Sequence, residues 1–311
     1  MQRRIDAHVH LRAGRWVGKR EERFGLTLEQ NGLLRLPDGG AIPLMPPYFH
    51  DSRFEADTLL ALMDQFAIER AVIMQSLAYD VTPEIADAAA RWPERIAGAM
   101  VIEPKGGWQD TMEYWYARGL RVVKYEMSCG FGFTTPSCYP DLRLNDPIML
   151  EIFERAMALG LTVTVDPTFQ DAPGHQPEAL YEAARHCPEL KFVICHLGFP
   201  RPTVLENRED WKKWKQMLQL AELPNVWFDF SAMPDIFCAE GCPWPTAGRL
   251  IRQFLLEYGP EKLIWGSDIP GTLCNATYGQ ICDTFTKSAA LTDDECRRLY
   301  YQNAKEVYFP D

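Results

Sequence analysis

The sequence of 311 residues lacks several features that define large classes of proteins. It has no stretch approaching the roughly 18 consecutive apolar residues that cross a membrane, and no apolar N-terminal region of the kind that signal peptides carry. It also lacks clusters of Lys and Arg, and a net charge of −11 disfavours a surface that binds nucleic-acid phosphates. We therefore predict a cytoplasmic protein that acts on a small molecule, without nucleic-acid or membrane partners, whose aromatic-bearing loops offer an interface for a homo-oligomer.

Regularly spaced cysteine pairs are missing as well. The nine cysteines are odd in number and scattered, which favours reduced thiols over a disulfide framework. Cys238 and Cys242 have a spacing that zinc sites use, but no second pair accompanies them, so free thiols are the preferred interpretation. No G-x-G-x-x-G turn follows the first predicted strand, which removes the main reason to expect a dinucleotide-binding fold.

What the chain does contain is an alternation of short apolar runs, typical of strands buried on both faces, with segments that have apolar residues at helical spacing. The predicted strands cover residues 5–10, 71–76, 96–102, 121–126, 161–166, 191–196, 225–231 and 263–268. The predicted helices cover residues 55–66, 83–91, 108–118, 147–159, 177–186, 206–222, 246–257, 276–288 and 292–307. Eight strand–helix units predict an α/β fold, a single (β/α)8 TIM barrel over residues 1–311, with long loops at 11–50 and 127–146.

The first predicted strand carries two histidines, His8 and His10. Because side chains alternate across a strand, Asp6, His8 and His10 are expected on one face, with Ile5, Ala7 and Val9 on the other. A neutral His is the commonest metal ligand in proteins, so the pair reads as half of a metal site. The alternative is a strand end with two solvated histidines.

Polar residues gather at the C-terminal ends of the predicted strands, where the active site of a TIM barrel lies. Beyond the two histidines these residues are Lys124, Glu126, Asp166, His196 and Asp268. Polar residues with unrelated structural roles would not all be expected at the same end of the barrel. The pattern therefore predicts an active site.

The chemistry of these side chains predicts their roles. His8, His10 and Asp268 offer nitrogen and oxygen ligands to a divalent metal, with zinc preferred over manganese, and a bound metal makes a nucleophile of water. Asp268 is alternatively the general base that takes a proton from water. His196 is predicted to polarise a carbonyl or to orient the water.

A further set is predicted to bind the substrate. Its members are Lys124, Glu126, Arg53, Arg201, His50 and Tyr48. The two arginines are candidates for gripping a substrate anion. For Lys124, an ion pair with Glu126 or Asp166 is an equal alternative, and the residues of the 11–50 loop are alternatively surface or loop-packing residues.

Several motifs together resemble the amidohydrolase superfamily, and in particular its amidohydrolase-related branch of metal-dependent hydrolases, lactonases and aminocarboxymuconate-semialdehyde-type decarboxylases. The motifs are Asp6-Ala7-His8-Val9-His10, Cys195-His196-Leu197-Gly198-Phe199-Pro200, the segment 224–231, Trp265-Gly266-Ser267-Asp268-Ile269-Pro270 and Gln302-Asn303-Ala304. The resemblance implies a distorted barrel. It also implies metal or catalytic roles for His8, His10 and Asp268, with His196 in the catalytic set.

One position departs from this resemblance, because Asp166 stands where zinc-binding members usually carry a histidine. Asp166 is therefore predicted as a carboxylate metal ligand, and a metal-free mechanism like that of some lactonases remains the alternative. The preferred function is hydrolysis of a small cyclic ester (a lactone) or amide that is polar or bears a carboxylate. The alternatives are a metal-dependent nonoxidative decarboxylase of an aromatic or muconate-type acid, and a barrel that binds a ligand without catalysis.

Overall fold

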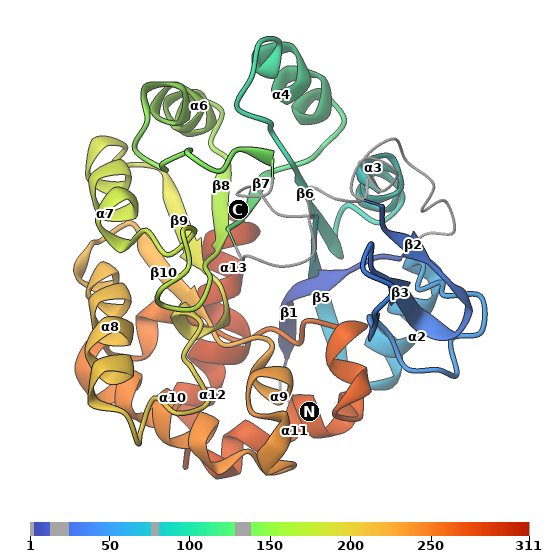
Figure 1. Ribbon diagram of the computed structural model, residues 1–311. Coiled ribbons are helices and arrows are strands. Elements are labelled where there is room, and N and C mark those ends of the chain that lie inside the picture. Colours follow the sequence, from blue (N-terminus) through green and yellow to red (C-terminus); the bar gives the residue numbers. More distant parts are fainter. Residues whose placement is uncertain (1–2, 13–24, 76–80, 128–137, 311) are drawn as a thin grey trace.

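A parallel sheet of eight strands forms the centre of the protein (Figure 1). The computed structural model describes residues 3–12, 25–75, 81–127 and 138–310. The strands follow one another around the sheet in chain order: β1 (Arg4–His10), β5 (Ile68–Met74), β6 (Ile96–Met100), β7 (Val122–Glu126), β8 (Thr162–Asp166), β9 (Lys191–Ile194), β10 (Val226–Asp229) and β11 (Leu263–Ile264). The prediction of a (β/α)8 barrel is confirmed.

The barrel closes through the chain that follows β11. Val9 forms a parallel bridge with Ile269, the backbone N–H of His10 donates to the Ile269 carbonyl at 2.7 Å, and that of Asp268 donates to the His8 carbonyl at 2.7 Å. The predicted strand 263–268 is wrong beyond Ile264, because Asp268 has a φ of 62° and so leaves the extended conformation. This departure places the Asp268 carboxylate beside β1.

Helices surround the barrel on its outer side (Figure 1). They are α2 (Ala56–Gln65), α3 (Thr82–Arg91), α4 (Trp108–Ala117), α6 (Pro147–Ala158), α7 (Pro177–His186), α8 (Arg208–Leu218), α9 (Met233–Ile236), α10 (Pro245–Tyr258), α11 (Tyr278–Ser288), α12 (Asp293–Arg297) and α13 (Asn303–Tyr308). Most lie within two or three residues of the predicted ranges. Local signals explain their starts: proline begins α6, α7 and α10, and Thr–Gln or Thr–Glu capping boxes begin α11 and α12.

Two predicted helices are divided in the structure. The range 206–222 contains α8 and then a 3₁₀ turn, η3 (Gln219–Glu222). The range 292–307 is interrupted by a π-helical segment, η7 (Arg298–Gln302), in which the Leu299 carbonyl accepts a hydrogen bond from the Trp265 N–H at 2.9 Å. The side chains that follow in α13 then close the lower end of the barrel, where Thr164 bonds to the Tyr308 hydroxyl at 3.1 Å. Helix α13 therefore covers the N-terminal end of the barrel, opposite the end at which the cavity opens.

Strand β1 does not alternate regularly. Its pairing with β5 shifts between Asp6 and Val9, so that Ile5 and Ala7 pack with the interior residues of other strands while Val9 packs with the outer core under the helices. Asp6 faces outward, where its carboxylate accepts a bond from the Tyr278 hydroxyl of α11 at 2.8 Å. The expectation that Asp6 shares a face with His8 and His10 is wrong, because the bulge turns the chain between Asp6 and His8.

The segment predicted as a long loop at 11–50 contains a second, small sheet. It is antiparallel and three-stranded, with β2 (Thr27–Leu28), β3 (Leu33–Arg35) and β4 (Ala41–Pro43), and a 3₁₀ turn, η1 (Gln30–Gly32), precedes β3. These strands are too short to show a period-two pattern in the sequence. Residues 13–24 of this predicted loop, and 128–137 of the loop at 127–146, lie outside the described residues.

The structure bears on two predictions of the sequence analysis, one about membrane spans and one about free cysteines. Within the described ranges, no helix has the length and apolar character needed to span a membrane. The eight cysteines that the structure describes are free, and Cys238 and Cys242 are exposed. Among these described residues, neither belongs to a group of side chains arranged to hold a metal ion.

Candidate active site

A cavity of about 590 Å³ opens at the C-terminal ends of the barrel strands. Its floor carries polar side chains from the strand ends: His10, Glu126, Asp166, His196 and Asp268. Its upper walls come from the chain after β4, including Tyr48, and from the chain after β11, including Asn275. Arg12 and Asp235 also line it. Five of the strand-end residues predicted from the sequence therefore meet in one cavity.

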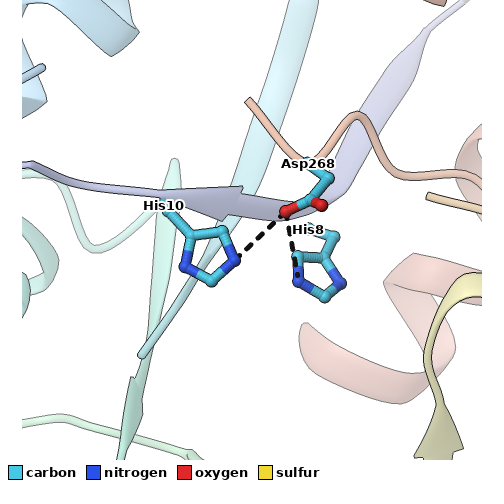
Figure 2. A group of neighbouring side chains, drawn as sticks. All are labelled: His8, His10 and Asp268. Atoms are coloured by element: carbon cyan, nitrogen blue, oxygen red, sulfur yellow. Dashed lines mark ion pairs between the residues drawn. The ribbon is translucent and has the colours of Figure 1, made fainter. Parts of the chain in front are cut away.

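His8, His10 and Asp268 form a compact group at this floor (Figure 2). The Nε2 atom of His10 lies 3.1 Å from Asp268 Oδ1, the Nε2 atom of His8 lies 3.7 Å from the same oxygen, and one ligand atom of each residue lies within 4.8 Å of the others. His8 Nε2 is buried and has no hydrogen-bond partner among the described residues. Two imidazole nitrogens and a carboxylate oxygen are ligands that zinc takes, so these residues fit a divalent metal.

Asp229, at the end of β10, orients the histidines from below. Its Oδ2 lies 3.1 Å from His8 Nδ1, and its Oδ1 accepts the backbone N–H groups of His196 at 2.9 Å and Ser231 at 3.0 Å, together with the Ser231 hydroxyl. A carboxylate on one ring nitrogen fixes the tautomer of a histidine, which directs the free Nε2 of His8 toward His10 and Asp268. Burial opposes ionisation of Asp229, but the hydrogen bonds and charges of the neighbouring histidines hold its pKa well below the usual range.

His196 occupies the opposite side of the floor. Its Nδ1 lies 2.8 Å from Ser231 Oγ, and its Nε2 lies 3.5 Å from Asp166 Oδ1. Burial lowers the pKa of a histidine, but the carboxylates of Asp166, Asp268 and Asp229 outweigh it and raise the pKa of His196 to about 9. His196 is therefore a cation at neutral pH and has donors to offer a substrate oxygen.

The charge states of the metal-ligand group suit the binding of a cation. Burial lowers the pKa of His10 to about 3, which keeps its ring neutral. Burial opposes ionisation of Asp268, but its hydrogen bond with His10 and the nearby histidines hold its pKa well below the ordinary value. Metal binding requires neutral imidazoles and an ionised carboxylate, and both conditions hold here at neutral pH.

The structure brings three more of the predicted residues to the cavity. Glu126, Asp166 and Tyr48 line it, and burial together with the Asp166 charge raises the pKa of Glu126 to about 7. Asp166 contacts His196. Among the described residues, it does not belong to the group that His8, His10 and Asp268 form. Lys124 is buried beneath the floor, with its Nζ 3.5 Å from Cys195 Sγ and its charge among the interior carboxylates.

Three other predicted residues do not line the cavity. Arg53 lies half-exposed near Asp51, Arg201 forms an ion pair with Asp171 at 3.1 Å, and His50 is exposed. All three occupy loops, whose course the sequence pattern does not determine.

Asp229, Ser231 and Asp235 were not among the predicted site residues. Asp229 interrupts the apolar run of β10 at its C-terminal end, so the strand-end criterion that identified Asp166 and His196 would also have found it. Asp235 lies in the short helix α9, and no periodic pattern in the sequence indicates its position. Its Oδ1 accepts a hydrogen bond from Asn275 Nδ2 at 2.8 Å.

Fold and site together define a TIM barrel with a cluster of ionisable side chains at the C-terminal ends of its strands. The chain belongs to the amidohydrolase family, whose model matches residues 5–309. Family membership confirms the resemblance drawn from the sequence motifs.

Two lactonases are related to part of the chain. It is 29% identical over 178 residues to an L-fucono-1,5-lactonase of Burkholderia ambifaria, a match that covers 53% of this chain and 56% of that protein. It is 23% identical over 188 residues to an L-rhamnono-gamma-lactonase of Scheffersomyces stipitis, covering 54% and 55% respectively. These matches span little more than half the length of either lactonase.

Solved structures share the whole fold at low identity. An amidohydrolase of Burkholderia multivorans with bound zinc superposes with a TM-score of 0.70 at 17% identity, covering 98% of both chains. A probable 2-pyrone-4,6-dicarboxylic acid hydrolase of Acinetobacter baumannii with bound citric acid gives 0.68 at 19%, again covering 98% of both. A 2,6-dihydroxybenzoate decarboxylase in complex with 2,6-dihydroxybenzoate gives 0.59 at 13%, covering 99% of both. The shared fold therefore hosts both hydrolysis and decarboxylation.

Proposed function

We propose that the protein is a hydrolase that opens a small, uncharged, hydroxyl-bearing lactone. The observation that carries this proposal is the composition of the cavity, whose described lining has four acidic side chains, Glu126, Asp166, Asp235 and Asp268, against two cationic ones, Arg12 and His196. Carboxylates accept hydrogen bonds from hydroxyl groups and repel a second carboxylate. The relationship to two sugar lactonases supports the same substrate class.

Asp268 is the general base in this mechanism. It is ionised, stands at the floor of the cavity and has one carboxylate edge turned to the two histidines, which leaves the other oxygen for a proton (Figure 2). A carboxylate in this position takes a proton from water as the water attacks the lactone carbonyl. The proton then passes to the ring oxygen that leaves as the new hydroxyl.

His196 stabilises the charge that develops on the carbonyl oxygen. Ser231 holds its Nδ1 at 2.8 Å, and the Ser231 hydroxyl is itself bonded to Asp229, so the imidazolium is fixed before the substrate binds. A fixed donor aimed at developing negative charge is the strongest general source of catalysis in acyl transfer.

His8, His10 and Asp268 are the residues that would hold a divalent metal, with zinc preferred over manganese. Bound there, such an ion would supply Lewis acidity that favours ionisation of water and polarises a carbonyl. The unpartnered Nε2 of His8 and its carboxylate-bound Nδ1 support this assignment. Asp166 is left to pair with His196.

The function is tested with a panel of pentono- and hexono-lactones followed by pH-indicator and mass-spectrometric assays. We expect the ring-opened hydroxy acid, with one oxygen from labelled water and no carbon dioxide. Release of carbon dioxide from 2,6-dihydroxybenzoate, without turnover of any lactone, would favour the decarboxylase alternative. Tight binding of a lactone with no product would favour a ligand-binding barrel. Cytoplasmic location and the absence of macromolecular partners stay predictions.

The metal site makes a separate prediction. Protein purified in the presence of zinc is expected to retain the ion through gel filtration, as measured by elemental mass spectrometry, while the His10→Asn variant loses it. The control is His186→Asn, because His186 is half-exposed and pairs with Glu154 far from the cavity. Full activity of protein stripped by a chelator would contradict metal catalysis and favour the metal-free mechanism.

A further inference from the structure

We propose that Asp235 and Asn275 form the part of the cavity that recognises a hydroxyl group of the substrate and so set its specificity. This inference rests on the proposed lactone hydrolysis and deepens it, because it assigns recognition to residues that take no part in the reaction. The pair is called the Asp235–Asn275 site below.

Both residues come from chain segments that follow barrel strands and meet above the floor. Asp235 lies in α9, shortly after β10, and Asn275 follows the 3₁₀ turn η6 (Gly271–Cys274) after β11. Asn275 Nδ2 donates to Asp235 Oδ1 at 2.8 Å, and both side chains line the cavity. The bond fixes the carboxylate in one orientation.

This orientation leaves the second carboxylate oxygen, Oδ2, as a further acceptor on a side chain that lines the cavity. In the part of the chain that the structure describes, the Asp235 side chain makes a single protein hydrogen bond, through Oδ1. A Cβ atom added to Gly271 would lie 3.9 Å from Asp235 Oδ2, and Gly271 also lines the cavity. A side chain at position 271 would therefore be in van der Waals contact with Oδ2 at the wall of the cavity.

The Asp235–Asn275 site is close to the reacting centre but separate from it. The charges of Asp268 and His196 act on the ionisation of Asp235. The Asp268 carbonyl, just before η6, accepts the backbone N–H of Thr272 in η6 at 3.3 Å. Among the described residues, Asp235 contributes to neither group of potential metal ligands. The chain after β11 therefore contributes both the general base, Asp268, and Asn275 of the Asp235–Asn275 site.

The Oδ2 atom of Asp235 favours substrates that carry a hydrogen-bond donor at this place. A hydroxyl on the lactone ring or its side chain donates to Oδ2, whereas an analogue without that hydroxyl leaves a partly buried carboxylate without its partner. A site built to bond a hydroxyl rejects the analogue that lacks it far more strongly than an apolar pocket rejects a missing methylene. We therefore expect hydroxyl-bearing lactones to be preferred over γ-butyrolactone.

The test compares the hydroxylated lactone that the wild type hydrolyses fastest in the panel with γ-butyrolactone. Asp235→Leu removes the acceptor at similar volume, and we expect kcat/KM for the hydroxylated lactone to fall about 10- to 100-fold, mainly through KM, with kcat/KM for γ-butyrolactone nearly unchanged. Gly271→Ala keeps the Asp235–Asn275 bond and places a methyl beside Oδ2, so it should give the same selective loss. Asp87→Asn, an exposed change on α3, is the charge control.

The outcomes separate the two levels of the proposal. An equal loss on both lactones, or no loss with either variant, would overturn the specificity role while leaving lactone hydrolysis in place. Failure of the wild type to hydrolyse any lactone would overturn the proposed function, and the assignment of Asp235 with it. Circular dichroism and thermal unfolding of Asp235→Leu identify the case in which that variant fails to fold, and Gly271→Ala then decides the test.

Discussion

Replacement of Asp268 by Asn is expected to reduce kcat/KM for the lactone by about 10³-fold or more, because an amide cannot take the proton from water. Asn has nearly the same shape and is one of the residues that tolerate a positive φ, so the φ of 62° at this position is retained. The measurement is steady-state kinetics on the best lactone of the panel. We expect the secondary structure and the unfolding temperature to stay close to those of the wild type.

The control for this variant is Asp171→Asn. Asp171 is exposed and pairs with Arg201 and Lys213 outside the cavity, so its loss of charge should leave kcat/KM unchanged. A folded Asp268→Asn protein that retains a tenth of the wild-type activity would show that another group is the base. Since Asp268 also belongs to the metal-ligand group, the metal content of the variant should be measured together with its kinetics.

Replacement of Asp229 by Ala is expected to have the largest effect on stability. Asp229 is fully buried and accepts bonds from His8, His196 and Ser231, so its removal leaves buried donors without partners beside the cationic His196. Breaking such a buried charge network costs about 3–5 kcal/mol of unfolding free energy. The measurement is urea denaturation followed by tryptophan fluorescence.

The same variant should lose activity even where it stays folded. Without Asp229, His8 Nδ1 keeps only its contact with Ser231 Oγ at 3.2 Å, and the loss of a carboxylate partner typically weakens metal affinity 10- to 100-fold. Asp6→Asn provides the matched control, because Asp6 is an equally buried aspartate of β1 that faces α11 instead of the interior. Asp6→Asn should lower stability while its folded fraction keeps its activity. If both variants retained full activity, Asp229 would have only a structural role.

The sequence was sufficient to predict the barrel and the end of it that carries the site. A strand buried in a parallel sheet is an apolar run in the sequence, regardless of the strands with which it pairs. Seven of the eight predicted strands therefore lie close to their observed positions. The strand-end positions of Asp166 and His196 follow from this alone, because the interior face of each strand leads to the same opening. The small sheet at residues 27–43 could not be predicted, because strands of two or three residues carry no periodic signal.

The sequence predicted Asp268 together with His8 and His10, but it could not predict the irregular backbone that brings such residues together. The approach of Asp268 to His10 depends on a positive φ, and the Asp235–Asn275 site depends on where two loops meet. Both are set by tertiary packing. The bulge in β1 belongs to the same class, since the pattern Ile5-Asp6-Ala7-His8 has regular alternation in the sequence and loses it only through pairing with β5.

That bulge makes the site sensitive to the number of residues in β1 as well as to their identity. Asp6 anchors the strand to α11 on one side, and its carboxylate also accepts the Ser267 N–H at 2.8 Å, while His8 reaches the interior on the other. If the same residues paired without the bulge, simple alternation would put Asp6 on the face of His8 and His10, so that either the Asp6–Tyr278 bond or the inward direction of the histidines would be lost. The number of residues in β1 is therefore as much a requirement of the site as the identities of His8 and His10, and a change in strand length should be tolerated less than a conservative substitution.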